Sequence, residues 1–118
     1  MHTRGELLAA AWEVAVRFRA HGGYGTEARA YQALRRRRPG FTDRQYRNAL
    51  RRGLALYDAA ADLVARDARA LHGQTDVWAG RFPDFRDLAA DLRPLCRGFR
   101  APTYRAALLW VFCWHHLR

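Results

Sequence analysis

Arginines are the residues of this sequence best suited to bind a ligand, and they are concentrated between Arg29 and Arg52. That stretch holds nine arginines and one acidic residue, a net charge of +8 over 24 residues, whereas the other 94 residues together carry +2. A guanidinium forms paired hydrogen bonds to phosphate or carboxylate oxygens, and cations gathered this closely repel one another until an anion binds. The predicted binding residues are Arg35, Arg36, Arg37, Arg38, Arg44, Arg47, Asn48, Arg51 and Arg52.

The chemistry expected of this cluster is electrostatic binding to a nucleic-acid backbone, either DNA or RNA. Phosphate contacts of this kind hold the polymer without reading its sequence, and five or six of them would give a log–log salt slope of roughly −5. Asn48 lies between pairs of arginines and is the one candidate for a contact to a base edge. A tight turn between the two groups of arginines should bring them to one end of a helical hairpin.

Two alternatives to nucleic acid fit the same cluster. An acidic protein partner would supply the missing negative charge as carboxylates. In the other alternative, the cluster is a solvent-exposed helix face without a ligand, because one or two cations near a helix C-terminus complement the helix dipole. That dipole needs far fewer than the four consecutive arginines at positions 35–38.

A second motif runs from Arg66 to His72. An arginine, a polar residue (here Asp67) and a histidine a few positions later resemble the motif of small α-helical ribonucleases of the HEPN type. The resemblance covers seven residues and implies that Arg66 holds a phosphate while His72 transfers protons. In the alternative interpretation, His72 is a cation at a helix C-terminus beside Gly73. We place a non-catalytic role first and the ribonuclease last.

The serine, lysine, cysteine and histidine content of the sequence indicates neither a catalytic site nor a metal site. The chain has no Ser and no Lys, which excludes a serine nucleophile, a Schiff base and a Walker-type phosphate loop. Cys113, His115 and His116 are close in sequence, but adjacent histidines diverge by about 100° around a helix, so we expect neither a metal site nor a cofactor.

Carboxylates and loop aromatics complete the candidates. Asp84, Asp87 and Asp91 have the spacing of an outward helix face rather than of a catalytic pair. Trp78 and Phe82 fall in the longest predicted loop. We expect them to pack against the core, with stacking on nucleic-acid bases as the alternative.

Leu, Ala and Arg dominate the composition, and all three favour helix, so we predict one all-α domain over residues 1–118 with five or six helices. Thr3 with Glu6 and Thr42 with Gln45 have the form of capping boxes, which open helices. Gly53 should mark a bend or a close helix crossing. The predicted helices cover residues 4–21, 27–38, 43–72, 83–96 and 102–117, and the one over 43–72 is expected to be a single long central helix.

An internal repeat appears when the chain is offset by 58 residues. Eight of twenty positions are then identical between residues 31–50 and 89–108, including Gly40 with Gly98 and Tyr46 with Tyr104. We interpret this as a duplicated helix–turn–helix hairpin, with repeat halves at about 24–58 and 82–118. The alternative is that two unrelated hairpins converged on the same turn chemistry.

The last predicted helix, residues 102–117, is apolar on every side. We expect it to be the central helix of the bundle, or else half of a homodimer interface. Its apolar run from Ala106 to Trp114 is nine residues, whereas a membrane-spanning helix needs about 20. With no secretory signal recognised at the N-terminus, we expect a cytoplasmic protein without a membrane partner.

Overall fold

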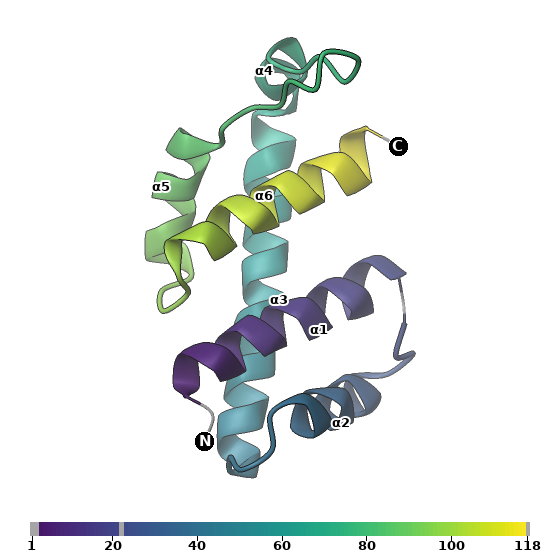
Figure 1. Ribbon diagram of the computed structural model, residues 1–118, viewed down its shortest axis with the longest axis vertical. Helices are drawn as coiled ribbons and strands as arrows, with labels where there is room; N and C mark the ends of the chain where they lie inside the picture. The colour runs from purple at the N-terminus through teal and green to yellow at the C-terminus, as the bar shows by residue number, and fades with distance from the viewer. Residues whose placement is uncertain (1–2, 22, 118) are drawn as a thin grey trace.

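Helix α3 (Asp43–Arg66) is the axis on which the rest of the protein is assembled. The computed structural model describes residues 3–21 and 23–117, in which six helices and no regular strand occur. Four helices pack against α3, namely α1 (Arg4–His21), α2 (Glu27–Arg37), α5 (Arg86–Leu95) and α6 (Ala101–His116) (Figure 1). The short helix α4 (Ala68–Gly73) follows the end of α3. The prediction of an all-α bundle is confirmed.

Two small cores lie along α3 rather than one large core. The first is built from α1, α2 and the N-terminal half of α3, with Leu34 and Tyr46 almost completely buried. The second joins the C-terminal half of α3 to α4, α5 and α6, and contains Leu92 and Tyr104. Phe99, in the turn before α6, packs against both cores. Both halves of the molecule therefore depend on the same helix.

Gly53 is the point where α1 crosses α3 most closely. A methyl group added there would lie 2.7 Å from the carbonyl oxygen of Ala11 and 3.2 Å from the backbone nitrogen of Trp12. The neighbouring atoms belong to the backbone of α1, which cannot move aside as a flexible side chain could. The predicted close crossing at Gly53 is confirmed.

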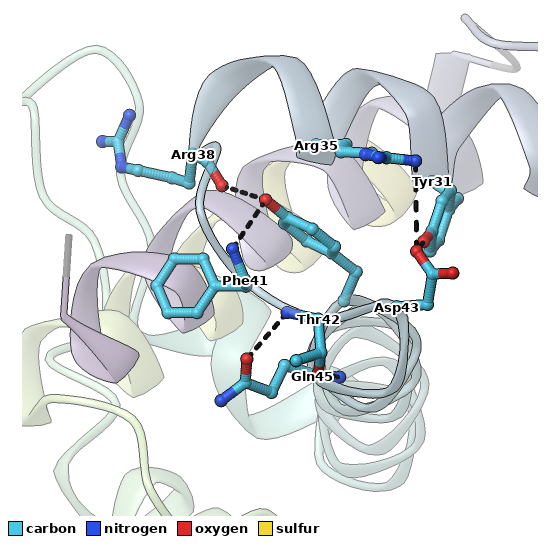
Figure 2. Close-up of polar contacts among 8 residues, drawn as sticks. Tyr31, Arg35, Arg38, Phe41, Thr42, Asp43 and Gln45 are labelled. Atoms are coloured by element: carbon cyan, nitrogen blue, oxygen red, sulfur yellow. Dashed lines mark hydrogen bonds and ion pairs between the residues drawn. The ribbon is translucent and has the colours of Figure 1, made fainter. Parts of the chain in front are cut away.

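The turn between α2 and α3 is held by one tyrosine. The Tyr46 hydroxyl donates to the Arg38 carbonyl oxygen at 2.6 Å and accepts from the Phe41 backbone nitrogen at 3.2 Å (Figure 2). Gly40 supplies the left-handed conformation, with φ of 103°. Thr42 then opens α3 with the predicted capping box, since its N–H donates to Gln45 and its hydroxyl accepts from the Gln45 N–H.

The turn between α5 and α6 repeats this arrangement. The Tyr104 hydroxyl donates to the Cys96 carbonyl oxygen at 2.6 Å and accepts from the Phe99 backbone nitrogen at 3.2 Å. Gly98 has φ of 102°. Each tyrosine follows its partner residues by the same sequence distance as in the first hairpin. Duplication and convergence would both produce this likeness, so a common origin of the two hairpins stays a prediction.

Two predicted helix boundaries are wrong. The helix expected over residues 43–72 is interrupted at Asp67, where φ and ψ are −107° and 16°, and α4 then carries Leu71 into the second core. The helix expected from Pro83 begins instead at Arg86. Phe85 just before it adopts a left-handed conformation, φ 59°, with its side chain buried in the second core. In both places burial of an apolar side chain decides where the helix breaks.

The prediction that the last helix is central is also wrong, because α3 occupies that place. One side of α6 is buried, with Leu108 and Phe112 fully enclosed. On the other side Leu109 is 40% exposed, and Trp110 and Trp114 are half-buried. Trp110 also packs against the second core, with its ring centroid 6.3 Å from that of Tyr57, so only part of this outer side of α6 faces away from the protein.

Candidate nucleic-acid interface

Two of the arginines that close α2 are committed to contacts within the protein. Arg37 donates from Nη1 to the Glu13 carboxylate of α1 at 2.7 Å. Arg38 donates from Nη1 to the Arg37 carbonyl oxygen at 2.9 Å, and its Nε is buried without a hydrogen-bond partner in the described part of the chain. These two guanidiniums tie the end of α2 to α1 and to its own backbone, which leaves them less free to meet a ligand.

The other two arginines of the run, Arg35 and Arg36, are exposed. Arg35 lies 3.9 Å from the Asp43 carboxylate, a weak ion pair at the start of α3 (Figure 2). Asp43 is engaged more closely by the Tyr31 hydroxyl, which donates to it at 2.5 Å. That hydrogen bond to a carboxylate raises the pKa of Tyr31. Arg36 lines one hollow with Tyr24 and Gln32, and a second with Tyr46 of α3.

On α3 the predicted arginines form a continuous exposed face. Arg44, Arg47 and Arg51 are all exposed, and their spacing of three and four residues places them on one side of the helix over about 10 Å. Asn48 is exposed beside them. Among the described residues, no carboxylate lies within 4.0 Å of these three guanidiniums. This set of three is called the α3 arginine face below.

The α3 arginine face borders an open groove of about 690 Å³ between α2, α3 and the end of α1. Arg47 and Arg51 line it above an apolar floor that includes Leu50 and Leu54. Arg19 of α1 also lines the groove and forms an ion pair with Asp58 at 3.0 Å. The sequence analysis missed Arg19 because it lies outside the arginine-rich stretch and reaches the groove only through the crossing of α1 over α3.

Arg52, the last predicted residue, faces away from this groove. Its guanidinium donates to the Arg97 carbonyl oxygen in the turn between α5 and α6. The nine predicted residues therefore do not converge on one surface. The structure brings Arg44, Arg47, Asn48 and Arg51 together and keeps Arg35 and Arg36 exposed nearby, whereas Arg37, Arg38 and Arg52 bind other groups of the same chain.

The residues of the ribonuclease-like motif are engaged elsewhere. Arg66 donates to the Asp67 carboxylate through Nε at 2.9 Å and to Asp91 through Nη2 at 3.1 Å. These contacts raise the pKa of Arg66 and lower that of Asp67. The His72 ring packs edge-on against Phe112, with ring centroids 5.3 Å apart. A guanidinium already bound by two carboxylates is poorly placed to hold a phosphate.

The C-terminal histidines and cysteines form no metal-binding arrangement. No group of three or more His, Cys, Asp or Glu side chains suited to an ion occurs in the described part of the chain. His115 hydrogen-bonds to the Tyr57 hydroxyl at 2.7 Å. Burial, with smaller effects of His72 and His115, lowers the pKa of His116. Burial also raises the pKa of both thiols, Cys96 and Cys113, so neither is an activated nucleophile.

The loop aromatics do not pack inward as expected. Trp78 is 100% exposed and Phe82 is 42% exposed. The tip of this loop is closed by paired backbone hydrogen bonds between Asp76 and Arg81 and by an ion pair of 3.1 Å between their side chains. The prediction that these rings cover the core is wrong, because Phe85 and Leu71 already fill the adjoining part of the second core.

No helix within residues 3–21 and 23–117 combines the length and apolar character needed to cross a membrane. Comparison with known proteins adds no relative: the chain matches no protein-family model, no curated protein and no solved structure.

Proposed function

We propose that this protein is a small non-catalytic nucleic-acid-binding protein that holds the phosphate backbone through the α3 arginine face. The observation that carries the proposal is the exposure of Arg44, Arg47 and Arg51 on one side of α3, with no carboxylate of the described residues within 4.0 Å. A face about 10 Å long is matched to roughly three nucleotides of a strand that rises 3.4 Å per step. Arg35 and Arg36 extend the positive surface toward α2.

The position of this face on its helix supports the same proposal. Arg44 lies in the first turn of α3, where the positive end of the helix dipole makes a cation unfavourable, and Arg47 follows in the next turn. Asp43 is the acidic residue of that first turn, and it is already engaged by Tyr31 and Arg35. A bound phosphate would relieve both the repulsion among the arginines and the conflict of Arg44 with the dipole.

The test compares two triple variants of equal charge. We expect Arg44→Gln/Arg47→Gln/Arg51→Gln to weaken binding to mixed-sequence DNA or RNA at least tenfold at low salt and to reduce the salt slope by about 2 to 3. The matched control, Arg66→Gln/Arg69→Gln/Arg81→Gln, removes three exposed arginines from the C-terminal end of α3, from α4 and from the loop that follows α4. Fluorescence anisotropy over a salt series measures both, with circular dichroism to check folding. Equal losses in the two variants, or no binding by the wild type at low salt, would overturn the proposal.

A second candidate function is self-association through the outer side of α6. The supporting observation is the row formed by Leu109, which is 40% exposed, and the half-buried Trp110, Cys113 and Trp114. An apolar helix side of this kind is typical of a homodimer contact. Light scattering distinguishes this candidate, since a dimer formed by this side should become a monomer when Leu109 is replaced by Arg.

A further inference from the structure

We infer that the α5–α6 hairpin carries a second phosphate-binding surface, so that one molecule holds two nucleic-acid segments, one on each side of α3. This inference rests on the function proposed above and adds to it a second contact surface and the capacity to bridge. The surface consists of Arg86, Arg93, Arg97 and Arg105 and is called the α5–α6 arginine surface below.

Two adjoining hollows form this surface, with volumes of about 200 and 410 Å³. They share Ala90, Arg93 and Tyr104, and alanines make up much of the lining of the first. Four arginines and no carboxylate line the two hollows. The groove beside the α3 arginine face is different, because Glu27 and Asp58 are part of its lining. The second surface is therefore the more purely positive of the two.

Acidic residues of α5 lie on a different side of the helix. Arg86, Ala90 and Arg93 follow one another at four and three residues, which places them on one face, whereas Asp87 and Asp91 follow another. Asp91 forms an ion pair with Arg66 at 3.1 Å. Because of these carboxylates, the net charge counted along α5 is low. They nevertheless form no ion pair with the arginines of the α5–α6 arginine surface among the described residues.

Comparison of the two hairpins shows why the arginine at the second turn lacks the neighbouring carboxylate found at the first. In the first hairpin, Asp43 accepts from Tyr31 at 2.5 Å and lies 3.9 Å from Arg35. The positions 58 residues later are Ala101, Ala89 and Arg93. The carboxylate and the phenol are thus replaced by methyl groups, while the arginine stays. The Arg93 guanidinium instead lies 5.7 Å from the centroid of the Tyr104 ring.

The two surfaces lie on opposite sides of the protein. In Figure 1, α2 and α5 lie on opposite sides of α3, so the groove between α2 and α3 and the hollows between α5 and α6 are separated by the central helix. With principal extents of 44 × 28 × 23 Å, the molecule is too small for a stiff duplex to bend around α3 and reach both surfaces. Two segments are therefore expected to bind at once.

The experiment uses the full chain to capture a fluorescent duplex in solution on beads that carry a second duplex. We expect wild-type protein to bridge the two duplexes at low salt. Ala90→Glu places a carboxylate in both hollows while keeping every arginine, and should reduce bridging about tenfold while lowering affinity for a single duplex less than about threefold. Ala70→Glu, on the exposed side of α4, adds the same charge and should change neither.

A second variant, Arg86→Gln/Arg93→Gln, should also reduce bridging at least about tenfold, because it removes two of the four arginines of the α5–α6 arginine surface. Bridging that persists in both variants, or that disappears equally with Ala70→Glu, would overturn the inference and leave the proposed function standing. Failure of the wild type to bind any duplex at low salt would overturn the proposed function as well. Binding by the wild type without bridging would overturn the second surface alone.

Discussion

The two hairpins of this protein share a turn and differ in almost everything around it. In each, a tyrosine hydroxyl joins the end of one helix to the start of the next through hydrogen bonds of 2.6 and 3.2 Å. Around the first turn, arginines meet carboxylates of α1 and α3, whereas around the second the arginines surround alanines. The turn geometry is set by a few backbone contacts, so the charged surface beside it is free to vary.

The largest change in the free energy of unfolding is expected at a pair of equivalent positions that hold a glycine in the first half and a buried valine in the second. Gly53 leaves room for the backbone of α1, while its counterpart Val111 is completely buried in the second core. Gly53→Ala should lower the free energy of unfolding by about 2 kcal/mol, because overpacking exceeds the gain in helix propensity. Val111→Ala should cost about 2 kcal/mol through the cavity that it leaves.

Urea unfolding measures both substitutions. Gly73→Ala is the control for the glycine, since an added methyl group there would meet nothing within 4 Å beyond its chain neighbours and the backbone of its own helix. It should be neutral or slightly stabilising. If Gly53→Ala behaved like Gly73→Ala, the crossing of α1 over α3 would be looser than described here.

The shared turn predicts an equal, somewhat smaller effect in both halves. Tyr46→Phe and Tyr104→Phe each remove one hydroxyl and leave one carbonyl and one N–H without a partner. We expect about 1 to 2 kcal/mol of destabilisation in each case, because the sites are partly buried. Denaturant midpoints of the two variants should agree closely. A large difference between them would show that the turns are alike in geometry but not in energy.

A weaker effect is expected from the ion pair found only in the first hairpin. Arg37 donates to Glu13 at 2.7 Å, whereas the corresponding residue of the second hairpin, Leu95, is 65% exposed. Arg37→Leu should cost less than about 1 kcal/mol, since the pair is open to solvent. The cost should shrink at high salt, so unfolding at two salt concentrations checks it. A cost that does not change with salt would point to lost packing instead.

The smallest expected effect is a pH dependence of the free energy of unfolding, which arises from His116 in the second half of the molecule. Burial and the nearby His72 and His115 lower the folded-state pKa of His116 from its ordinary value of 6.5. Below that value the unfolded chain binds a proton that the folded chain resists, so stability should fall as the pH drops below 6.5 and level off once the folded form is protonated too. Unfolding midpoints for the wild type and His116→Gln over this range provide the measurement. The variant should lose part of the slope.

Much of the fold could be predicted because its signals are local. Thr42 and Gln45 form the expected capping box and Gly53 marks the expected crossing, and Gly40 and Gly98, paired in the sequence repeat, adopt the same left-handed conformation. The failures have a common cause in tertiary packing. Asp67 interrupts a sequence that is otherwise suited to one helix, so that Leu71 reaches the second core, and this demand has no local signature.

The candidate site was harder to predict, because charge was counted along the sequence and not around the helices. A window of net charge gathers Arg37 and Arg38 with Arg44 and Arg47, although the structure engages the first two internally. Assigning each arginine to a face of its helix, from spacings of three and four residues, separates the exposed arginines from the engaged ones better than a net charge does. The same spacing at Arg86 and Arg93 would have indicated the second hairpin, where interleaved acidic residues conceal the arginines.

The arrangement of two cores on α3 has a consequence for how the protein unfolds. Leu50 and Leu54 belong to one core and Leu56 and Val64 to the other, so melting any part of α3 removes apolar surface from both. The chain should therefore open as one cooperative unit despite its two centres of packing. In hydrogen exchange, the central amides of α3 should be the slowest, while those of the short α4 should exchange through local fraying.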